Sequence, residues 1–434
     1  MKKKVFAILI ALAVQIVCLG QTNREMLEQD PYRALGNMYP YHQLDSVYTP
    51  APEGYELFYV SYTGRHGSRY LLDFKDRVES LKTFEKYKEK GWLTEEGLRL
   101  YDDLSYILKA SEDKEGKLSS LGERELQGIG GRLRHNTGGL FRDGAVIETY
   151  STKVDRVMKT RDNLLKGLCV GIEPDVKYYV TNVKKDHKAR SGKEVRGYHM
   201  APEYKERETN QNAHRGYYRA LWKNEYDASS FRNRIFTPDA RIGDPCRESS
   251  NLLSIGASCL ASGEPMPDIT KYFTADELYY IWERKNIGTF SHSCLWDGCA
   301  PYRTYNWGAG IVECIMEDAD EVISGKKNVA ATLRFTHDAY LIPVQSFMDI
   351  EGVNFRTMAQ AEKYFRNYDN ISMGVNIQLF FYRNAKGKVL VKILRNEKET
   401  RVSGLKPQIG GVYYKWDTLK KFWKKRADSK YRLK

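Results

Sequence analysis

Residues 56–69, ELFYVSYTGRHGSR, carry the features from which the fold and chemistry of this chain can be predicted. The run from Glu56 to Tyr62 is apolar, aromatic and β-branched, which is typical of a buried strand. The strand is predicted to end just after Thr63, at the glycine-flanked turn Gly64-Arg65-His66-Gly67. Because α/β folds place ligand chemistry at the carboxyl ends of their strands, we expect a site at this turn.

The turn places a histidine between two arginines, Arg65 and Arg69. Guanidinium groups are permanently charged, planar donors that suit two-point contact with a phosphate or a carboxylate. Nearby positive charge disfavours the imidazolium form, so His66 is expected to be neutral and nucleophilic. Gly67 is expected to let a substrate approach the imidazole without a Cβ in the way. Taken alone, such a pentapeptide is more often plain surface charge.

Outward from this strand, strand and helix patterns alternate along the chain. Strands are predicted at 145–150, 177–183 and 329–336, and helices at 74–87, 94–109, 120–135 and 152–168. Helix-capping patterns begin at Ser120, Thr152 and Thr274. Two further strands, 376–382 and 388–394, predict a hairpin. The alternation predicts the α/β class, with a mostly parallel sheet core flanked by helices.

Between residues 184 and 327 this alternation stops. The segment is polar, holds most of the cysteines and shows only patchy helices, such as 274–285. We interpret 184–327 as an inserted, mainly helical or irregular cap. The α/β catalytic core is then formed by 21–183 together with 328–434.

Residues 1–20 are predicted to be a secretory signal peptide. A basic start at 2–4 precedes an apolar run at 5–17, and Cys18-Leu19-Gly20 places small residues before a cleavage point. A lipid attached to Cys18 and a retained membrane anchor are the alternatives. No second apolar run of spanning length follows, so we expect an exported chain without integral membrane association, in the periplasm, on the surface or outside the cell.

In an exported chain, the cysteines that follow Cys18 are expected to form disulfides. These cysteines are Cys169, Cys246, Cys259, Cys294, Cys299 and Cys314. The simplest pairs join cysteines that are close in sequence, Cys246 with Cys259 and Cys294 with Cys299. A zinc site that includes His292 is the alternative for the second pair.

The composition excludes a disordered chain and indicates an anionic partner. Hydrophobic residues make up 41% of the chain, and no repeat or low-complexity tract is present. The formal net charge of +13 falls to about +10 without the signal lysines. This charge fits nucleic acid, an anionic surface or a polyanionic small molecule, or it serves solubility alone. The tail 415–434 is expected to pack its aromatic residues on the domain rather than to bind nucleic acid.

Two further pieces of sequence extend the site at the first turn. Arg156 lies in the first turn of a helix that follows a strand, so its side chain and the helix N-terminus can face the same anion. His337 and Asp338 end another predicted strand and supply a second phosphate donor and a carboxylic acid. A nucleophile, an acid and neutralising positive charge are what phosphoryl transfer to a side chain requires.

In this order, these motifs resemble those of the histidine acid phosphatases, in branch 2 of the histidine phosphatase superfamily. The matching segments are 65–69, 120–126, 151–156 and 336–338. The resemblance implies a phosphohistidine mechanism in which His66 is the nucleophile and Asp338 the proton donor. It implies phosphate binding by Arg65, Arg69, Arg156 and His337, and it implies no metal or other cofactor.

Within the family, the basic balance and the segments 376–384 and 388–396 resemble bacterial multiple inositol polyphosphate phosphatases and phytases. The expected partner is therefore a small polyanionic phosphate ester such as phytate. The order His337-Asp338 is also that of simpler acid phosphatases, so a broad-specificity enzyme acting on sugar phosphates or nucleotides is one alternative. A non-catalytic polyanion-binding protein is another. The basic loop 184–190 is either solvated or part of a pocket for extra substrate phosphates.

Overall fold

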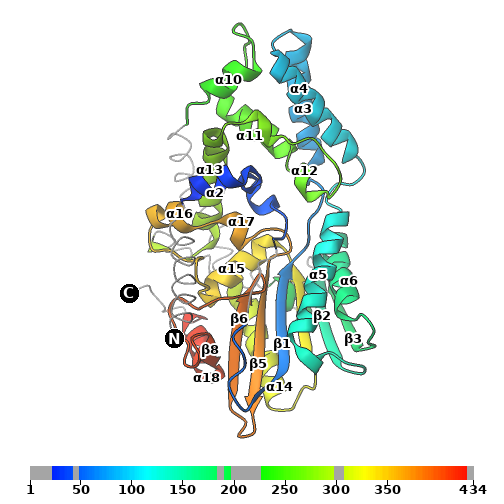
Figure 1. The fold of residues 1–434 in the computed structure, drawn as a ribbon, viewed down its shortest axis with the longest axis vertical. Coiled ribbons are helices and arrows are strands. Elements are labelled where there is room, and N and C mark those ends of the chain that lie inside the picture. The colour runs from blue at the N-terminus through cyan, green and yellow to red at the C-terminus, as the bar shows by residue number, and fades with distance from the viewer. Residues whose placement is uncertain (1–21, 43–47, 183–189, 197–225, 298–306, 428–434) are drawn as a thin grey trace, which may run out of the picture.

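A computed structural model describes residues 22–42, 48–182, 190–196, 226–297 and 307–427. At its centre is an eight-stranded sheet in the order β3-β2-β4-β1-β5-β6-β7, with β8 paired to β6 (Figure 1). The strands are β1 (Tyr55–Arg65), β2 (Val146–Thr152), β3 (Asp175–Thr181), β4 (Ala331–Thr336), β5 (Asn376–Asn384), β6 (Val389–Arg395), β7 (Lys398–Glu399) and β8 (Tyr413–Lys415).

The sheet has a parallel half and an antiparallel half. Strands β3, β2, β4 and β1 pair in parallel, whereas β1 pairs antiparallel with β5, and β5 pairs antiparallel with β6. The hairpin predicted from the sequence is the β5–β6 pair. The predicted α/β class is confirmed, and the parallel half carries the motifs at its carboxyl edge.

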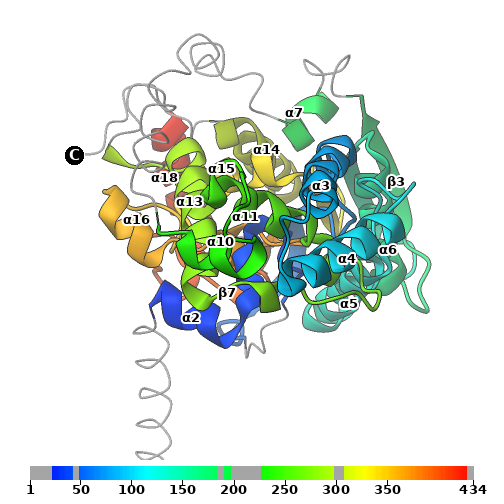
Figure 2. The same cartoon turned by 90° about the horizontal axis from the view of Figure 1, so that it is seen from above.

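Helices cover both faces of the sheet. On one face, α5 (Ser120–Asn136) and α6 (Asp155–Leu168) pack against apolar residues of β1, β2 and β4. On the other face, a second apolar cluster joins β5 and β6 to α14 (Ala309–Ile323), α15 (Asp338–Met348) and α18 (Trp416–Ala427). Figure 2 shows α5 and α6 on the opposite side of the molecule from α14 and α18.

A third apolar cluster lies in a layer of helices beyond the end of the sheet where β1 finishes (Figure 1). Its elements include α2 (Asn23–Gln29), η1 (Pro31–Met38), α3 (Phe74–Glu89), α4 (Glu95–Ala110), α10 (Ser229–Ile235), α11 (Pro245–Ile255), α12 (Ser258–Ala261), η4 (Thr270–Tyr272), α13 (Ala275–Ser293) and α17 (Asn367–Asn370). The layer is thus built from residues before, within and after the predicted insertion. The boundaries of a cap at 184 and 327 stay a prediction. The remaining short elements are η2 (Gly138–Leu140), α7 (Arg190–Arg196) and α16 (Met358–Tyr364).

The predicted helix starts agree with the structure to different degrees. At α13, Thr274 and Glu277 form the predicted capping box. At α5 the N-cap is Ser119, whose hydroxyl accepts from the amide of Gly122, so the predicted start is displaced by one residue. The predicted cap at Thr152 is wrong, because Thr152 completes strand β2 and α6 begins after Val154 without a side-chain cap.

The two predicted cysteine pairs have different outcomes. Cys259 is a free thiol, so the predicted Cys246–Cys259 disulfide is wrong. The Sγ of Cys246 instead lies 3.3 Å from the backbone oxygen of Tyr226. Cys299 lies outside the described residues, so the predicted Cys294–Cys299 disulfide lies outside them as well.

The predictions for the signal peptide and for the C-terminal tail concern the two ends of the chain. The signal peptide and Cys18 lie outside the described residues. Among the residues that are described, no helix is both long and apolar enough to cross a membrane. The tail forms α18 up to Ala427, with Trp416 and Trp423 buried in the apolar cluster beneath it. The expectation that its aromatic residues pack on the domain is confirmed for these two.

Candidate active site

The pairing of parallel strands brings the first and last motifs together. Arg65, the last residue of β1, lies opposite Thr336, the last residue of β4. The amide of His66 then donates to the backbone oxygen of Thr336 at 3.1 Å. Because β2 pairs with β4 on its other side, the start of α6 and its Arg156 also reach this edge. The predicted site residues therefore meet where three neighbouring strands end.

Three arginines, Arg65, Arg69 and Arg156, lie together in the site. Arg65 and Arg69 are buried, and burial together with the charges of Arg65 and Arg156 lowers the pKa of Arg69 to about 9. Within the described chain, Nε of Arg69 and Nε of Arg156 are buried without a hydrogen-bond partner. Buried like charges with unused donors are costly unless an anion binds them. The cluster therefore has the charge and the free donors of an oxyanion site.

His66 is held in the tautomer that a nucleophile needs. Its Nδ1 lies 3.0 Å from the carbonyl oxygen of Gly67, an atom that can only accept. Nδ1 must therefore carry the proton, which leaves the lone pair on Nε2. Burial, then the charges of Arg65 and Arg69, holds the pKa of His66 well below its usual value. The imidazole is thus neutral, and its basic nitrogen is Nε2.

His337 stands beside His66 and between two polar side chains. The two imidazole rings meet edge to face, with centroids 5.6 Å apart. Nε2 of His337 lies 3.3 Å from the hydroxyl of Thr152, and Nδ1 lies 3.5 Å from Nη2 of Arg156. Since a guanidinium only donates, the Nδ1 that faces it is the acceptor, and Nε2 carries the proton. The ring orientation is thereby fixed by Thr152 at the end of β2 and by Arg156 at the start of α6.

Asp338 closes the site at the start of α15. Its Oδ2 lies 3.1 Å from Nη2 of Arg65 and accepts from Nδ2 of Asn37 at 2.8 Å, while Oδ1 accepts from the amide of Ala339 at 2.9 Å. Burial alone would raise the pKa of Asp338, but Arg65, Asn37 and Arg69 outweigh it and lower the pKa to about 2. In the empty site Asp338 is a carboxylate.

The surroundings of Gly67 give a packing reason for glycine at this position. A Cβ at Gly67 would lie 2.9 Å from the backbone oxygen of Gly122 and 2.4 Å from a methyl group of Leu126, both on α5. The packing of α5 against the turn therefore requires glycine here, and the prediction that Gly67 leaves room for a substrate stays a prediction.

Glu125 is a residue beside the site to which the sequence analysis assigned no role. Its carboxylate accepts from the amide of Ser68 at 2.9 Å, from the hydroxyl of Ser68 at 2.8 Å and from the amide of Tyr41 at 2.8 Å. Burial raises its pKa to about 7 despite these donors. The spacing offered a signal, since Gly122, Glu125 and Leu126 share one helix face and that face meets the turn.

Substitution Glu125→Gln is expected to lower the free energy of unfolding by about 1–3 kcal/mol, because an amide NH2 would then face one of the three donors. The measurement is chemical denaturation at about pH 8, where a carboxyl with a pKa of about 7 is ionised. The control is Glu123→Gln on the exposed side of α5, expected to change stability by less than about 0.5 kcal/mol. Equal effects of both substitutions would contradict this role for Glu125.

The basic loop of the sequence prediction contributes no described group to the site. Residues 184–189 lie outside the described part of the chain. Arg190 is described, and it forms ion pairs with Glu194, Glu317 and Asp318 at 2.7–3.0 Å. Its charge is neutralised within the fold.

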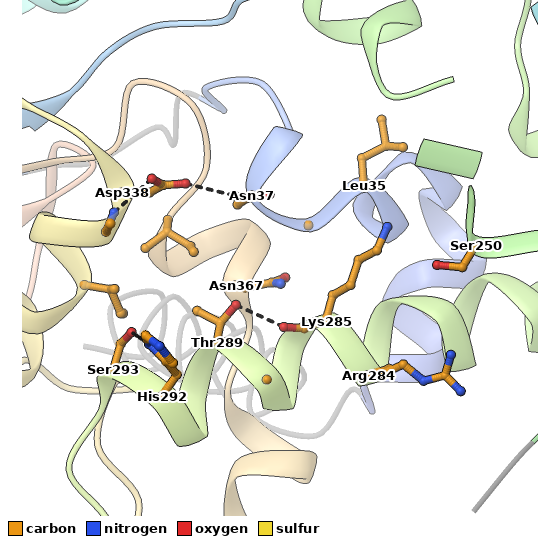
Figure 3. Close-up of a pocket in the computed structure, with 15 residues that line it drawn as sticks. Leu35, Asn37, Ser250, Arg284, Lys285, Thr289, His292, Ser293, Asp338 and Asn367 are labelled. Carbon is orange, nitrogen blue, oxygen red and sulfur yellow. Dashed lines mark hydrogen bonds between the residues drawn. The ribbon is translucent and has the colours of Figure 1, made fainter. Parts of the chain in front are cut away.

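A pocket of about 520 Å³ opens beside the site, and Asp338 and Asn37 border it (Figure 3). Helix α13 contributes Arg284, Lys285 and His292 to its wall, and Leu35, Ile342 and Ile371 supply apolar lining. Lys285 extends across this space, with its Nζ 3.1 Å from the hydroxyl of Ser254. Burial, then Arg77 and Arg284, lowers its pKa to about 8. The pocket is thus basic, and it meets the histidine–arginine cluster at Asp338.

Comparison with known proteins decides the family. The model of the histidine phosphatase superfamily (branch 2) matches residues 56–396. The chain belongs to this family. The resemblance inferred from the four motifs is confirmed. A comparison with curated protein sequences finds no match.

Solved structures show the same fold for this histidine phosphatase superfamily member. A multiple inositol polyphosphate phosphatase from Bifidobacterium longum, crystallised with inositol hexasulfate, is 19% identical, with a TM-score of 0.75 over 90% of this chain and 97% of that chain. A phytase from D. castellii is 17% identical, with a TM-score of 0.71 over 92% and 85% of the two chains. At this identity the likeness establishes the fold.

Proposed function

We propose that this protein is a phosphomonoesterase that hydrolyses inositol polyphosphates through a phosphohistidine intermediate. The observation that carries the proposal is a neutral, buried His66 among three arginines, with Asp338 between this cluster and a basic pocket. A nucleophile, a set of oxyanion donors and an acid are then within one site.

In the first step, the lone pair on Nε2 of His66 attacks phosphorus and the bond to the ester oxygen breaks. The three arginines neutralise the charge on the phosphoryl oxygens, and His337 donates the proton on its Nε2 to one of these oxygens. Asp338, protonated in the complex, gives its proton to the departing oxygen, and the alcohol leaves. In the second step, Asp338 accepts a proton from water, whose oxygen attacks phosphorus. The N–P bond breaks, which releases phosphate and restores neutral His66.

Protonation of Asp338 is coupled to substrate binding. In the empty site the arginines hold its pKa near 2. A bound phosphate dianion neutralises those arginines and adds negative charge near the carboxyl, and both effects raise the pKa. Asp338 is therefore protonated when a substrate is bound.

The pocket supports a polyphosphate substrate. The leaving oxygen must lie near Asp338, so the group attached to it extends to the Asp338 side of the site, where the basic pocket opens. The ammonium of Lys285 and the guanidinium of Arg284 on α13 can meet phosphates on the remainder of the substrate. Its volume of about 520 Å³ lies in the range of small-molecule sites. The structurally similar inositol polyphosphate phosphatase from Bifidobacterium longum was crystallised with inositol hexasulfate, and this analogy also supports an inositol polyphosphate as substrate.

Export of the chain belongs to the same proposal. Its support is the basic start at 2–4 followed by the apolar run at 5–17. An exported enzyme would meet phosphorylated substrates outside the cytoplasm.

The test compares phosphate release from phytate and from 4-nitrophenyl phosphate between about pH 4 and pH 8. We expect a clear preference for phytate. Lys285→Gln should raise the KM for phytate roughly 10-fold, because one charge-assisted contact is lost, and should leave the aryl phosphate almost unaffected.

The control for this substitution is Lys82→Gln on α3, where an exposed ammonium pairs with Glu79 at 2.9 Å. It should leave both substrates unchanged. Comparable rates on both substrates in the wild-type protein would instead indicate a broad-specificity acid phosphatase. Binding of phytate without phosphate release would indicate a polyanion-binding protein.

A further inference from the structure

Asn37 reaches the site from a segment that lies before the family match. The match begins at residue 56, whereas Asn37 belongs to η1 near the start of the described chain. Its side-chain Nδ2 donates to Oδ2 of Asp338 at 2.8 Å (Figure 3), and its backbone oxygen accepts from Nη1 of Arg65 at 2.5 Å. One residue therefore contacts both the acid and an arginine of the cluster.

The place of Asn37 is fixed by the packing around it. Ala34 and Leu35 are buried in the apolar cluster of the helical layer. Gly36 turns the chain with a φ of +59°, and a Cβ there would lie 2.9 Å from the side chain of Asn367. The hydroxyl of Tyr39 donates to Asp30 at 2.5 Å and so ties the two ends of η1 together.

The two oxygens of Asp338 lie in different surroundings. Oδ2 accepts a hydrogen bond from the amide of Asn37 at 2.8 Å and forms an ion pair with Nη2 of Arg65 at 3.1 Å. Oδ1 accepts from the amide of Ala339 at 2.9 Å. The positive charge of Arg65 and the donor of Asn37 both favour negative charge on Oδ2, so a proton on the carboxyl is favoured at Oδ1.

We propose that Asn37 is a positioning residue that, with Arg65, directs the transferable proton of Asp338 to Oδ1 and holds the carboxyl plane. The inference rests on the proposed phosphatase function, in which Asp338 protonates the leaving oxygen. Asn37 touches neither the phosphoryl group nor the nucleophile in this scheme. Its amide must point Nδ2 toward Asp338, because the amide oxygen would meet a carboxylate oxygen without a proton between them.

The consequence is a dependence on the leaving group. A poor alkoxide leaving group needs a proton in the transition state, whereas 4-nitrophenolate leaves without one. Asn37→Ala should therefore slow phosphate release from an alkyl ester such as glycerol phosphate by roughly 10-fold to 100-fold. The burst of 4-nitrophenol release from 4-nitrophenyl phosphate, which reports the first step alone, should change in rate by less than about 3-fold.

Two further variants separate positioning from loss of structure. Tyr39→Phe loosens the same segment without touching Asp338 or Arg65, and it should affect both substrates in the same proportion. Asn37→Ala placed in an Asp338→Asn background should cause little additional loss on the alkyl ester, because the two residues then act through one proton. Asn37→Asp should move the basic limb of the kcat profile to higher pH, since a second carboxyl raises the pKa of the first.

The outcomes distinguish this inference from the function on which it rests. Equal losses on both substrates in Asn37→Ala, or full additivity with Asp338→Asn, would overturn the role of Asn37 and leave the phosphatase proposal intact. A wild-type protein inactive on both esters would overturn both.

Discussion

His66→Ala is expected to reduce phosphate release from phytate and from 4-nitrophenyl phosphate by at least about 1,000-fold. The reason is that the substitution removes Nε2, the atom that would bond to phosphorus, while the arginines that bind the phosphate stay in place. The measurement is single-turnover phosphate release, with samples quenched in alkali and analysed for an N–P bond on the protein that survives alkali and is cleaved by acid. The bond should form in the wild-type protein and be absent in the variant.

The matched control is His135→Ala, because His135 lies on the exposed face of α5. This control should release phosphate at the wild-type rate. Retention of full activity in His66→Ala would overturn the covalent mechanism. If the variant also no longer binds inorganic phosphate, the loss of activity would instead indicate that His66 has a structural role in keeping the three arginines in position.

Asp338→Asn is expected to slow release from an alkyl phosphate by roughly 100-fold to 10,000-fold, since an amide cannot give a proton to the leaving oxygen. On 4-nitrophenyl phosphate, whose leaving group needs no proton, the first step should be affected far less. The measurement is a series of esters with leaving groups of increasing pKa, compared between variant and wild type. A steeper dependence on leaving-group pKa in the variant supports the assignment, and parallel lines would contradict it.

The pH profile follows from the directions of two pKa shifts. His66 must be neutral to react, and its pKa is held well below the usual 6.5. Activity should therefore be lost on the acid side only at a pH well below 6.5. Asp338 must be protonated, so kcat should fall as pH rises through its pKa in the complex. That pKa lies above the value of about 2 in the empty site, because the bound phosphate opposes the arginines. In Asp338→Asn this basic limb should disappear.

The strands, and the functional residues that follow their ends, could be predicted from the sequence. Runs of apolar and β-branched residues locate β1 and β4, and the parallel pairing of Arg65 with Thr336 brings their following residues together. Such signals are local, because a buried strand must be apolar along its length. The charges beyond the strand ends then follow from the geometry of a parallel sheet. The short strand β8, from Tyr413 to Lys415, has too few residues to show a period.

The residues that sequence reasoning missed act over long separations. Asn37 and Asp338 are 301 positions apart, and the segment around Asn37 shows no periodic pattern that would predict its place in the fold. Lys285 lies on a helix that was predicted, but the sequence does not show that this part of α13 borders Asp338. Both contacts depend on how the helical layer sits against the sheet, which is a property of tertiary packing.

The close approach of three backbones around Gly67 has a consequence for how the site can change. A Cβ on Gly130 of α5 would lie 2.1 Å from a backbone oxygen of α6, and one on Gly167 of α6 would lie 1.9 Å from a backbone oxygen of α5. Where side chains separate two helices, a changed rotamer can absorb a small displacement. Here main chain meets main chain, so there is no such compliance. The turn that carries His66 and the helices α5 and α6 are therefore expected to move as one rigid block. If the pocket binds the substrate, we expect adaptation to new substrates to arise in its wall on α13.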